Sequence, residues 1–597
     1  MSNFIKRDIF SINLLYIIRL VVISLILFNF VLIVYAESVD NGEPFEIWEK
    51  STLQTITETE EIILDEESAD TQNLSNDEYL ESSDVIESDF SYSTDDTLGL
   101  IDDISGGFDA NIWKGSGIKD IEYLLIQSPY TIYNSTLRNL KQKSLLTIAT
   151  PPLQESESEK NFFEIKLEHF KNIGDYDSIF KLSELIKIDE WSQELLQKII
   201  NYHLIYGEHK RICREEILKH VLDETLDLQI RSFCNAMSNN LPAIDLNISL
   251  LQEEGNYDEE LIYILSSYLN GTEILLENIE QIDLYKLTLL ENKKIDFSEY
   301  ITNDTNIDLQ MFYSLSSIPT NEKKISIVEN LVSQGTFQHD ILSKSYNQYL
   351  LDNNIKNGEA LENSELRTKD RILLYNQIRN TSNQKELVSL TSEFVNEMSE
   401  QNLLINSTPL IYDKIKIINP KQEFKDHTVS VCLVLILNGN MSQCQKWLKN
   451  LEFIKDTRKI KLRIRYLMSL KSDEIVFKAE DVQELLLEKN ISENKKNLIA
   501  KHFEILNNIS LLDYWKKPSV LEEVSSSFSN IKLAQYLNSI SNSKKGESIL
   551  LMNTIHGNKH SSSLDYYSLF LILNSLNNLD KIYLNNFVFE YFVNNPI

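Results

Sequence analysis

The four cysteines are the residues whose spacing most directly predicts a covalent feature. They form two sequence pairs, Cys213 with Cys234 and Cys432 with Cys444. The midpoints of the pairs fall at predicted turns, Asp223-Glu224-Thr225 and Gly439-Asn440. Residues equidistant from the turn of an antiparallel helical hairpin lie at the same height along the two axes. We therefore predict two disulfides, with four buried free thiols as the alternative.

Histidines and cysteines do not follow a metal-binding pattern. No C-x-x-C is present, and the nine histidines are scattered. His556 and His560 have a metal-like spacing, but Gly557 and the serines that follow favour a loop. The sequence therefore predicts no metal site.

Motifs for phosphate binding or nucleophilic catalysis are missing from the sequence. It contains neither G-x-x-x-x-G-K-[ST] nor G-x-G-x-x-G, which cradle phosphates. G-x-S-x-G and H-E-x-x-H are also missing. We therefore expect a protein that is not an enzyme and that carries no cofactor.

Composition and charge narrow the class of protein. The chain has 597 residues, of which 42 % are hydrophobic and 25 % charged, as in ordinary globular proteins. Only 15 glycines and 10 prolines occur, which disfavours a large all-β fold because turn-forming residues are scarce. The net charge of −33 argues against nucleic-acid binding, since there is no surplus of bases to neutralise phosphates.

Residues 1–36 have the organisation of an export signal. Lys6 and Arg7 precede a long apolar run that ends at Ala36, so a signal peptidase would leave Glu37 as the new N-terminus. The alternative is an uncleaved membrane anchor, because the mostly apolar stretch Ile12–Ala36 approaches the length that spans a bilayer. Both interpretations place the rest of the chain outside the cytoplasm.

An acidic segment follows, and we assign it to residues 37–105. Between Glu37 and Thr97 there are 20 acidic residues and one base, Lys50. Like charges repel, and too little apolar surface is available to offset the loss of chain entropy. We therefore predict a disordered tether, or alternatively an acidic arm for a basic partner.

The remainder of the sequence has helical periodicity. Apolar residues recur at helix spacing, as in Phe163, Leu167 and Phe170. We predict an all-α fold, an irregular α-solenoid of antiparallel, tetratricopeptide-like hairpins. It divides into residues 106–405 and 406–597, because the stretch Asn402–Lys425 contains Pro409 and Pro420. Trp113 is expected to pack at the start of the first hairpin, with an exposed anchor for a partner as the alternative.

Several helices are predicted to end at a glycine followed by a polar residue. Glycine adopts the left-handed conformation that closes a helix, and the next side chain can cap the following helix. The predicted joints are Gly174-Asp175, Gly207-Glu208, Gly335-Thr336 and Gly439-Asn440. Their uneven spacing predicts an irregular array rather than a regular repeat.

The pattern of spaced apolar and capping residues over 107–597 resembles that of a family of uncharacterised, exported helical-repeat proteins of alphaproteobacteria. The resemblance implies an α-solenoid in a bacterial periplasm, and it carries over no functional residue. It rests on Trp113, Leu124-Leu125, Ser128-Pro129, Leu137-Arg138-Asn139-Leu140, Pro151-Pro152, Gly174-Asp175, Ile230-Arg231-Ser232-Phe233-Cys234, Leu250-Leu251-Gln252-Glu253-Glu254-Gly255 and Gly546-Glu547.

The function expected first is that of a non-enzymatic scaffold in the cell envelope, whose concave surface binds an unknown protein or peptide. A second hypothesis is an enzyme, or its accessory subunit, that acts on cell-wall glycan and needs an acidic Glu in a sugar-binding cleft. A third is a purely structural envelope protein held by an uncleaved anchor. A eukaryotic luminal protein also fits, and the sequence leaves the oligomeric state open.

Overall fold

The computed structural model describes residues 94–130, 132–154, 160–255, 258–355, 367–452, 454, 457–488, 491–507, 539, 543–558, 564 and 566–594. These residues are predominantly α-helical and contain no β-strand, so the predicted all-α class is confirmed. The predicted signal or anchor, its cleavage site at Ala36 and Glu37, and most of the acidic segment lie outside the described residues.

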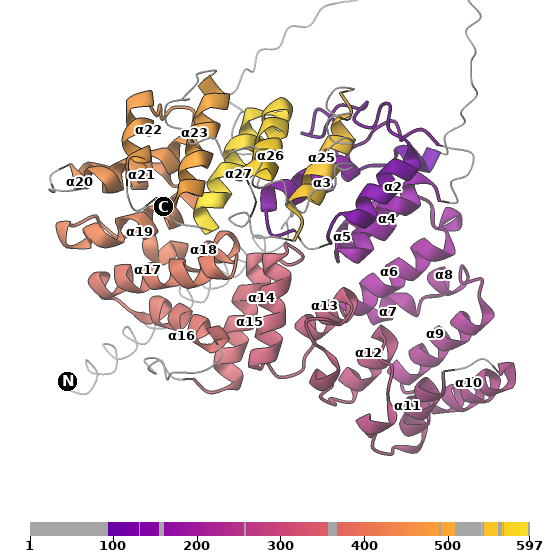
Figure 1. Cartoon of the computed structure of the whole chain (residues 1–597). Helices are drawn as coiled ribbons and strands as arrows, with labels where there is room; N and C mark the ends of the chain where they lie inside the picture. The colour runs from indigo at the N-terminus through magenta and orange to yellow at the C-terminus, as the bar shows by residue number, and fades with distance from the viewer. Residues whose placement is uncertain are drawn as a thin grey trace, which may run out of the picture. The chain divides into compact units, whose positions relative to one another are not determined.

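Helices follow one another along the described part of the chain from residue 118 onward (Figure 1). The helices of the first part are α2 Ile118–Gln127, α3 Ser135–Leu146, α4 Phe162–Asn172, α5 Tyr176–Ser183, α6 Gln193–Ile205, α7 His209–Ile212, α8 Glu215–Leu218, α9 Glu224–Met237, α10 Leu241–Glu254, α11 Glu259–Asn270, α12 Leu284–Asn292, α13 Ile307–Leu315, α14 Glu322–Ser333 and α15 His339–Asp352. Short 3-10 turns lie at η1 Thr94–Thr97, η2 Ile188–Glu190, η3 Leu276–Asn278, η4 Ser298–Tyr300 and η5 Gln422–His427.

The later helices complete the described fold. They are α16 Arg367–Asn380, α17 Gln384–Glu400, α18 Leu404–Ile415, α19 Thr428–Leu437, α20 Met441–Leu451, α21 Arg458–Ser469, α22 Ala479–Leu486, α23 Glu493–Asn507, α25 Lys545–His556, α26 Tyr566–Leu579 and α27 Lys581–Asn594.

Two of the predicted glycine joints have the expected local structure. Gly174 and Gly439 have φ of 74° and 72°, which glycine adopts without a steric penalty. Asp175 then caps α5 by accepting a hydrogen bond from the Ser178 amide, and Asn440 caps α20 in the same way. Gly207 and Gly335 are left-handed as well, with φ of 70° and 78°, but neither Glu208 nor Thr336 provides the predicted side-chain cap.

Neighbouring helices pack in pairs, and the two ends of the helical array also pack together. Close pairs include α9 with α10, α14 with α15 and α16 with α17. In addition, α25 and α27 contact α3, and α25 contacts α2, as the yellow and indigo helices of Figure 1 show. In an open solenoid each repeat contacts only its neighbours. The contacts between the first and last helices were therefore not part of the predicted arrangement.

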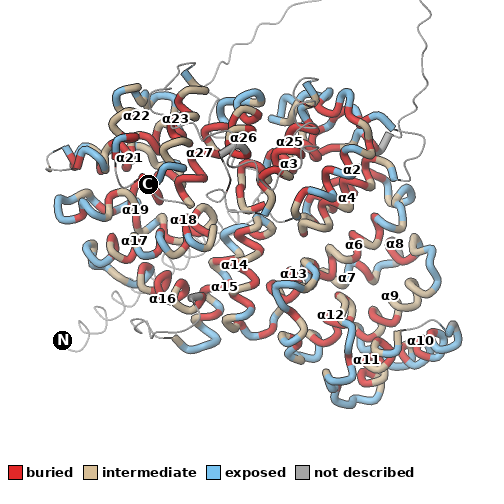
Figure 2. Tube along the Cα trace, viewed as in Figure 1, coloured by how far each residue is buried: buried red, intermediate tan, exposed pale blue. Residues whose placement is uncertain are grey.

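Buried residues, red in Figure 2, recur along the array and form one hydrophobic core. Leu98, Leu100 and Ile101 of the predicted acidic segment are partly buried and pack against this core. Residues 94–105, which we assigned to the tether, lie within the folded part. The Asp96 carboxylate accepts a hydrogen bond from the Phe163 amide at 3.2 Å, and the Leu100 amide donates to the Leu146 carbonyl at 2.7 Å. The folded region therefore begins earlier than predicted, because these residues bond to the ends of α3 and α4.

The predicted division at residue 405 falls inside α18, and the described residues on both sides of it belong to one compact unit. Pro409 lies within this helix, where it removes one backbone donor. The carbonyl of Ile405 accepts from the Thr408 hydroxyl at 3.4 Å instead. Packing of α18 on α15, α16, α17, α19 and α27 holds the helix, so the proline does not mark a break between two blocks.

Candidate functional site

The first predicted cysteine pair forms a disulfide. Cys213 and Cys234 are joined, with their Cα atoms 5.6 Å apart. Asp223, at the predicted turn, caps α9 by accepting a hydrogen bond from the Leu226 amide. The connection is more complex than a simple hairpin, because the short helix α8 lies between the two cysteines.

Removing this disulfide is expected to reduce stability. Its loop closes over a sequence separation of 21 residues, so the Cys213→Ser/Cys234→Ser variant should lose about 2–4 kcal/mol of unfolding free energy. Urea denaturation with and without reductant measures this loss. Reductant should destabilise the native chain and leave the variant unchanged; a further loss in the variant would contradict the free state of the other two thiols.

The second predicted disulfide is absent, and Cys432 and Cys444 are buried free thiols. They lie on the packed helices α19 and α20, as the hairpin argument required. However, the Cys444 Sγ lies 3.5 Å from the Met468 Sδ, while the Cys432 Sγ faces the Cys444 carbonyl at 4.0 Å. Burial raises the pKa of the Cys432 thiol, which keeps it protonated and unreactive.

Trp113 has the structural role that was expected first. It is buried, and its ring meets the Phe162 ring edge-on with 5.5 Å between centroids. On its other side lies Gly546 at the start of α25, where a Cβ atom would come within 2.3 Å of the indole. The Gly546 amide also donates to the Ile112 carbonyl at 3.0 Å. Glycine is therefore required here so that α25 can approach the first residues of the fold.

A buried carboxylate from the last helix caps an early one. Glu590 of α27 accepts hydrogen bonds from the Ser135 amide at 2.5 Å and the Thr136 amide at 3.1 Å, at the N-terminus of α3. The Ser135 hydroxyl donates to the same group at 2.9 Å. Arg138, which is half-buried, donates to the Ile132 and Ser333 carbonyls and supplies a nearby positive charge. Burial raises the pKa of Glu590, while these partners oppose the rise.

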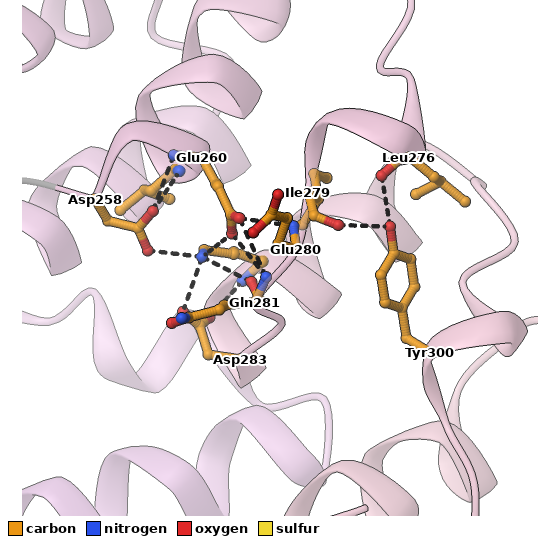
Figure 3. Close-up of polar contacts among 10 residues, drawn as sticks. Asp258, Glu260, Leu276, Ile279, Glu280, Gln281, Asp283 and Tyr300 are labelled. Atoms are coloured by element: carbon orange, nitrogen blue, oxygen red, sulfur yellow. Dashed lines mark hydrogen bonds and ion pairs between the residues drawn. The ribbon is translucent and has the colours of Figure 1, made fainter.

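A cluster of polar side chains surrounds Lys286, near the start of α12 (Figure 3). The ammonium lies 2.7 Å from both the Asp258 Oδ2 and the Glu260 Oε2, and it donates to the Gln281 carbonyl at 2.8 Å. Burial alone would lower the pKa of Lys286, but the hydrogen bonds to Asp258 and Glu260 raise it.

The Glu260 carboxylate and the Tyr300 hydroxyl also bind the loop before α12. The Glu260 Oε1 accepts from the amides of Glu280 at 2.6 Å and Gln281 at 3.1 Å. The Tyr300 hydroxyl lies 2.5 Å from the Leu276 carbonyl and 2.9 Å from that of Ile279 (Figure 3). Each of these side chains therefore hydrogen-bonds to backbone groups. Such bonds fix the conformation of a loop, and they leave no group of the cluster free to act as a general acid or base.

A second buried charged cluster links α14, α15 and α16. The Arg371 guanidinium binds both carboxylate oxygens of Glu329, through Nε at 2.9 Å and through Nη2. The Tyr346 hydroxyl donates to the same carboxylate at 2.5 Å, and Thr368 bonds to Arg371 at 3.1 Å. Both carboxylate oxygens have partners and both charges are buried, so this ion pair also joins neighbouring helices of the core.

A hollow of about 360 Å³ is bounded by residues 316–320, Gln348 and Asp352. Its carboxylate is occupied, because the Asp352 Oδ2 accepts from the Thr320 amide at 2.7 Å and Oδ1 accepts from Gln348 at 2.7 Å.

No group of His, Cys, Asp and Glu within the described residues is placed to hold a metal ion. His556 is buried with its Nδ1 3.1 Å from the Gly557 carbonyl, and His560 lies outside the described residues.

Lys141 is a buried cation that has no carboxylate partner in the described part of the chain. Among the described residues its ammonium reaches only the Ser128 hydroxyl at 3.2 Å and the Pro129 carbonyl at 3.5 Å. Burial, together with the nearby charge of Arg138, lowers the pKa of Lys141 to about 7. His169 faces the same region, and its pKa is held well below the usual value by burial and by Lys141.

We expect Lys141→Met to stabilise the protein most at low pH. The unfolded chain holds the lysine proton up to about pH 10.5 and the folded chain only to about pH 7, so burial of Lys141 opposes folding fully below pH 7. The variant should gain about 1–3 kcal/mol at pH 6, and this gain should shrink as the pH rises from 7 toward 10. Urea denaturation across that range measures it. Lys344→Met, at a position 77 % exposed, is the control; an equal gain there would contradict the role of burial.

Comparisons with known proteins returned nothing: no family model, no curated protein and no solved structure matches the chain. The resemblance to exported helical-repeat proteins therefore stays a prediction. A search of the described residues found no helix long and apolar enough to cross a membrane.

Proposed function

We propose that this chain is an exported, non-enzymatic scaffold that binds a protein or peptide in the cell envelope. In this proposal the helical hairpins form an irregular, tetratricopeptide-like solenoid, and its last helices close onto its first. The N-terminal signal or anchor would place it in a bacterial periplasm, with the acidic segment as a tether. The Cys213–Cys234 disulfide supports an oxidising compartment.

The main observation behind the proposal is that the buried charged side chains bind structural partners within the protein. In the described part of the chain, Lys286, Glu590 and Arg371 bind loop carbonyls, a helix N-terminus and a buried carboxylate. Apolar side chains, in contrast, remain on exposed helical surfaces, including Ile126 of α2 and Leu246 of α10. Buried charges with structural partners, together with exposed apolar side chains, are expected of a protein that binds other molecules at its surface rather than one that catalyses a reaction.

The glycan-cleaving alternative needs a protonated Glu that can reach a sugar. Glu590 has a raised pKa, but its carboxylate already accepts from the amides and hydroxyls of Ser135 and Thr136. It would have to leave the end of α3 to donate a proton to a glycan. The scaffold is therefore the better-supported function.

Photo-crosslinking in the producing cells tests the scaffold. A photoreactive residue is placed in three full-length variants, at Ile126 of α2, Leu246 of α10 and Ile582 of α27, which are 62 %, 59 % and 59 % exposed. The proposal expects a defined adduct from at least one position, and it expects competition by the purified chain. If all three positions gave no adduct while the purified protein released soluble fragments from cell-wall glycan, the scaffold would be wrong.

A further inference from the structure

The outward side of α10 carries an apolar stripe. Pro242, Leu246 and Leu250 are spaced four residues apart and therefore share one side of the helix. All three are exposed, Leu246 at 59 % and Leu250 at 36 %. In Figures 1 and 2, α10 lies at the rim of the view, with exposed residues along its outer side.

The opposite side of α10 is already used for packing. Ile244, Ile248 and Leu251 are buried, and the helix packs chiefly against α9 and α11. A helix at the margin of a helical array normally presents a polar outer face to water. Because α10 is apolar on both sides, its outer stripe is suited to contact with another molecule.

The surroundings of the stripe are acidic. Residues 221–260, which include α9, α10 and the start of α11, contain nine acidic residues and one base, Arg231. Asp245 and Glu253 of α10 are exposed, and neither has a Lys or Arg within ion-pair distance among the residues that the structure describes. This charge raises the local concentration of a cationic partner and repels an anionic one.

We propose that the Pro242–Leu246–Leu250 stripe docks a cationic amphipathic helix of a partner protein. Leucine-like side chains of the partner would cover the stripe, and flanking Lys or Arg would meet Asp245 and Glu253. This is the helix-on-helix mode of peptide recognition, in which apolar anchors give affinity and charged flanks give orientation. The inference rests on the proposed scaffold function and assigns a partner class to one surface.

Fluorescence anisotropy of a labelled peptide tests the proposal with the full-length protein. The probe is a helical peptide of about 18 residues with leucines at i, i+3 and i+4 spacing and lysines elsewhere. The expected result is that Leu246→Lys weakens binding at least about tenfold, whereas Ile582→Lys, at an equally exposed position of α27, leaves it unchanged. Added salt should weaken binding to the native chain.

Two further probes separate this site from attraction to the acidic N-terminal segment. A scrambled peptide of the same composition lacks an apolar face, so it should lose most of the Leu246-dependent affinity. A peptide with glutamates in place of lysines should not bind. Equal binding of the amphipathic and scrambled peptides, or equal affinity of the native and Leu246→Lys proteins, would overturn the proposal. Self-association of the native chain that Leu246→Lys abolishes would also overturn it, because the occupant would then be a second copy.

Failure of this inference can be distinguished from failure of the scaffold. Crosslinks from Ile126 or Ile582 without any from Leu246 would reject the α10 surface and leave the scaffold function standing. Absence of crosslinks at all three positions would count against both.

Discussion

Replacing Glu590 by Ala is expected to lower the free energy of unfolding by about 3–5 kcal/mol. The change removes the acceptors of the Ser135 and Thr136 amides and takes the nearby negative charge away from the half-buried Arg138. Because Glu590 lies on α27 and its partners on α3, we also expect the amides of α3 to lose protection from hydrogen exchange.

Two variants serve as controls for Glu590→Ala. Glu590→Gln keeps one oxygen acceptor but not the charge, so it should lose less stability. Glu277→Ala removes an exposed carboxylate and should change the urea midpoint very little. If Glu590→Ala lost no more than Glu277→Ala, the last helix would not be holding α3.

The second large effect is expected at the buried ion pair of Arg371 and Glu329. Arg371→Met should cost about 3–5 kcal/mol, because the Glu329 carboxylate then stays buried with only the Tyr346 hydroxyl as a partner. Removing both charges in Arg371→Met/Glu329→Leu should restore much of the stability, since the desolvation of both ions is avoided.

Urea denaturation of the native chain, both single variants and the double variant forms a double-mutant cycle for this pair. A double variant less stable than Arg371→Met would contradict the account. Retained stability in Arg371→Met would show that the pair is not buried as the structure places it.

The helices themselves were predictable because their signals are local. Phe163, Leu167 and Phe170 share one face at helix spacing, and all three are buried in α4. The glycine and aspartate at 174–175 act through neighbouring backbone groups, so the sequence alone contains the information for this joint. Sequence distance also predicted that Cys213 and Cys234 could meet.

The tertiary features were not predictable, because their partners are far apart in the sequence. Glu590 bonds to residues near 135, and nothing in the sequence around either segment indicates the other. Gly546 is a partial exception, since a lone glycine near a helix start indicates a close approach, although not the approach of Trp113. Cys432 and Cys444 are free although they lie on neighbouring helices, because helix spacing does not specify whether two facing thiols have the geometry of a disulfide.

Buried lysines were also missed. In the sequence Lys141, Lys286 and Lys324 look like solvent-facing residues of amphipathic helices. In the structure each reaches back to the loop before its own helix, as the Lys324 ammonium does to the Ser316 and Ile318 carbonyls. A long side chain can bury its stem and still find such acceptors, so composition and periodicity do not reveal these clamps.

The most direct test of an exported, disulfide-linked scaffold is the intact mass of the protein isolated from its own cells, after thiol alkylation with and without reduction. We predict a chain that begins at Glu37. Cys213 and Cys234 should be alkylated only after reduction, and Cys432 and Cys444 only after unfolding. A chain that keeps residues 1–36 and has four alkylatable thiols in the unreduced, unfolded state would contradict both cleavage and the disulfide.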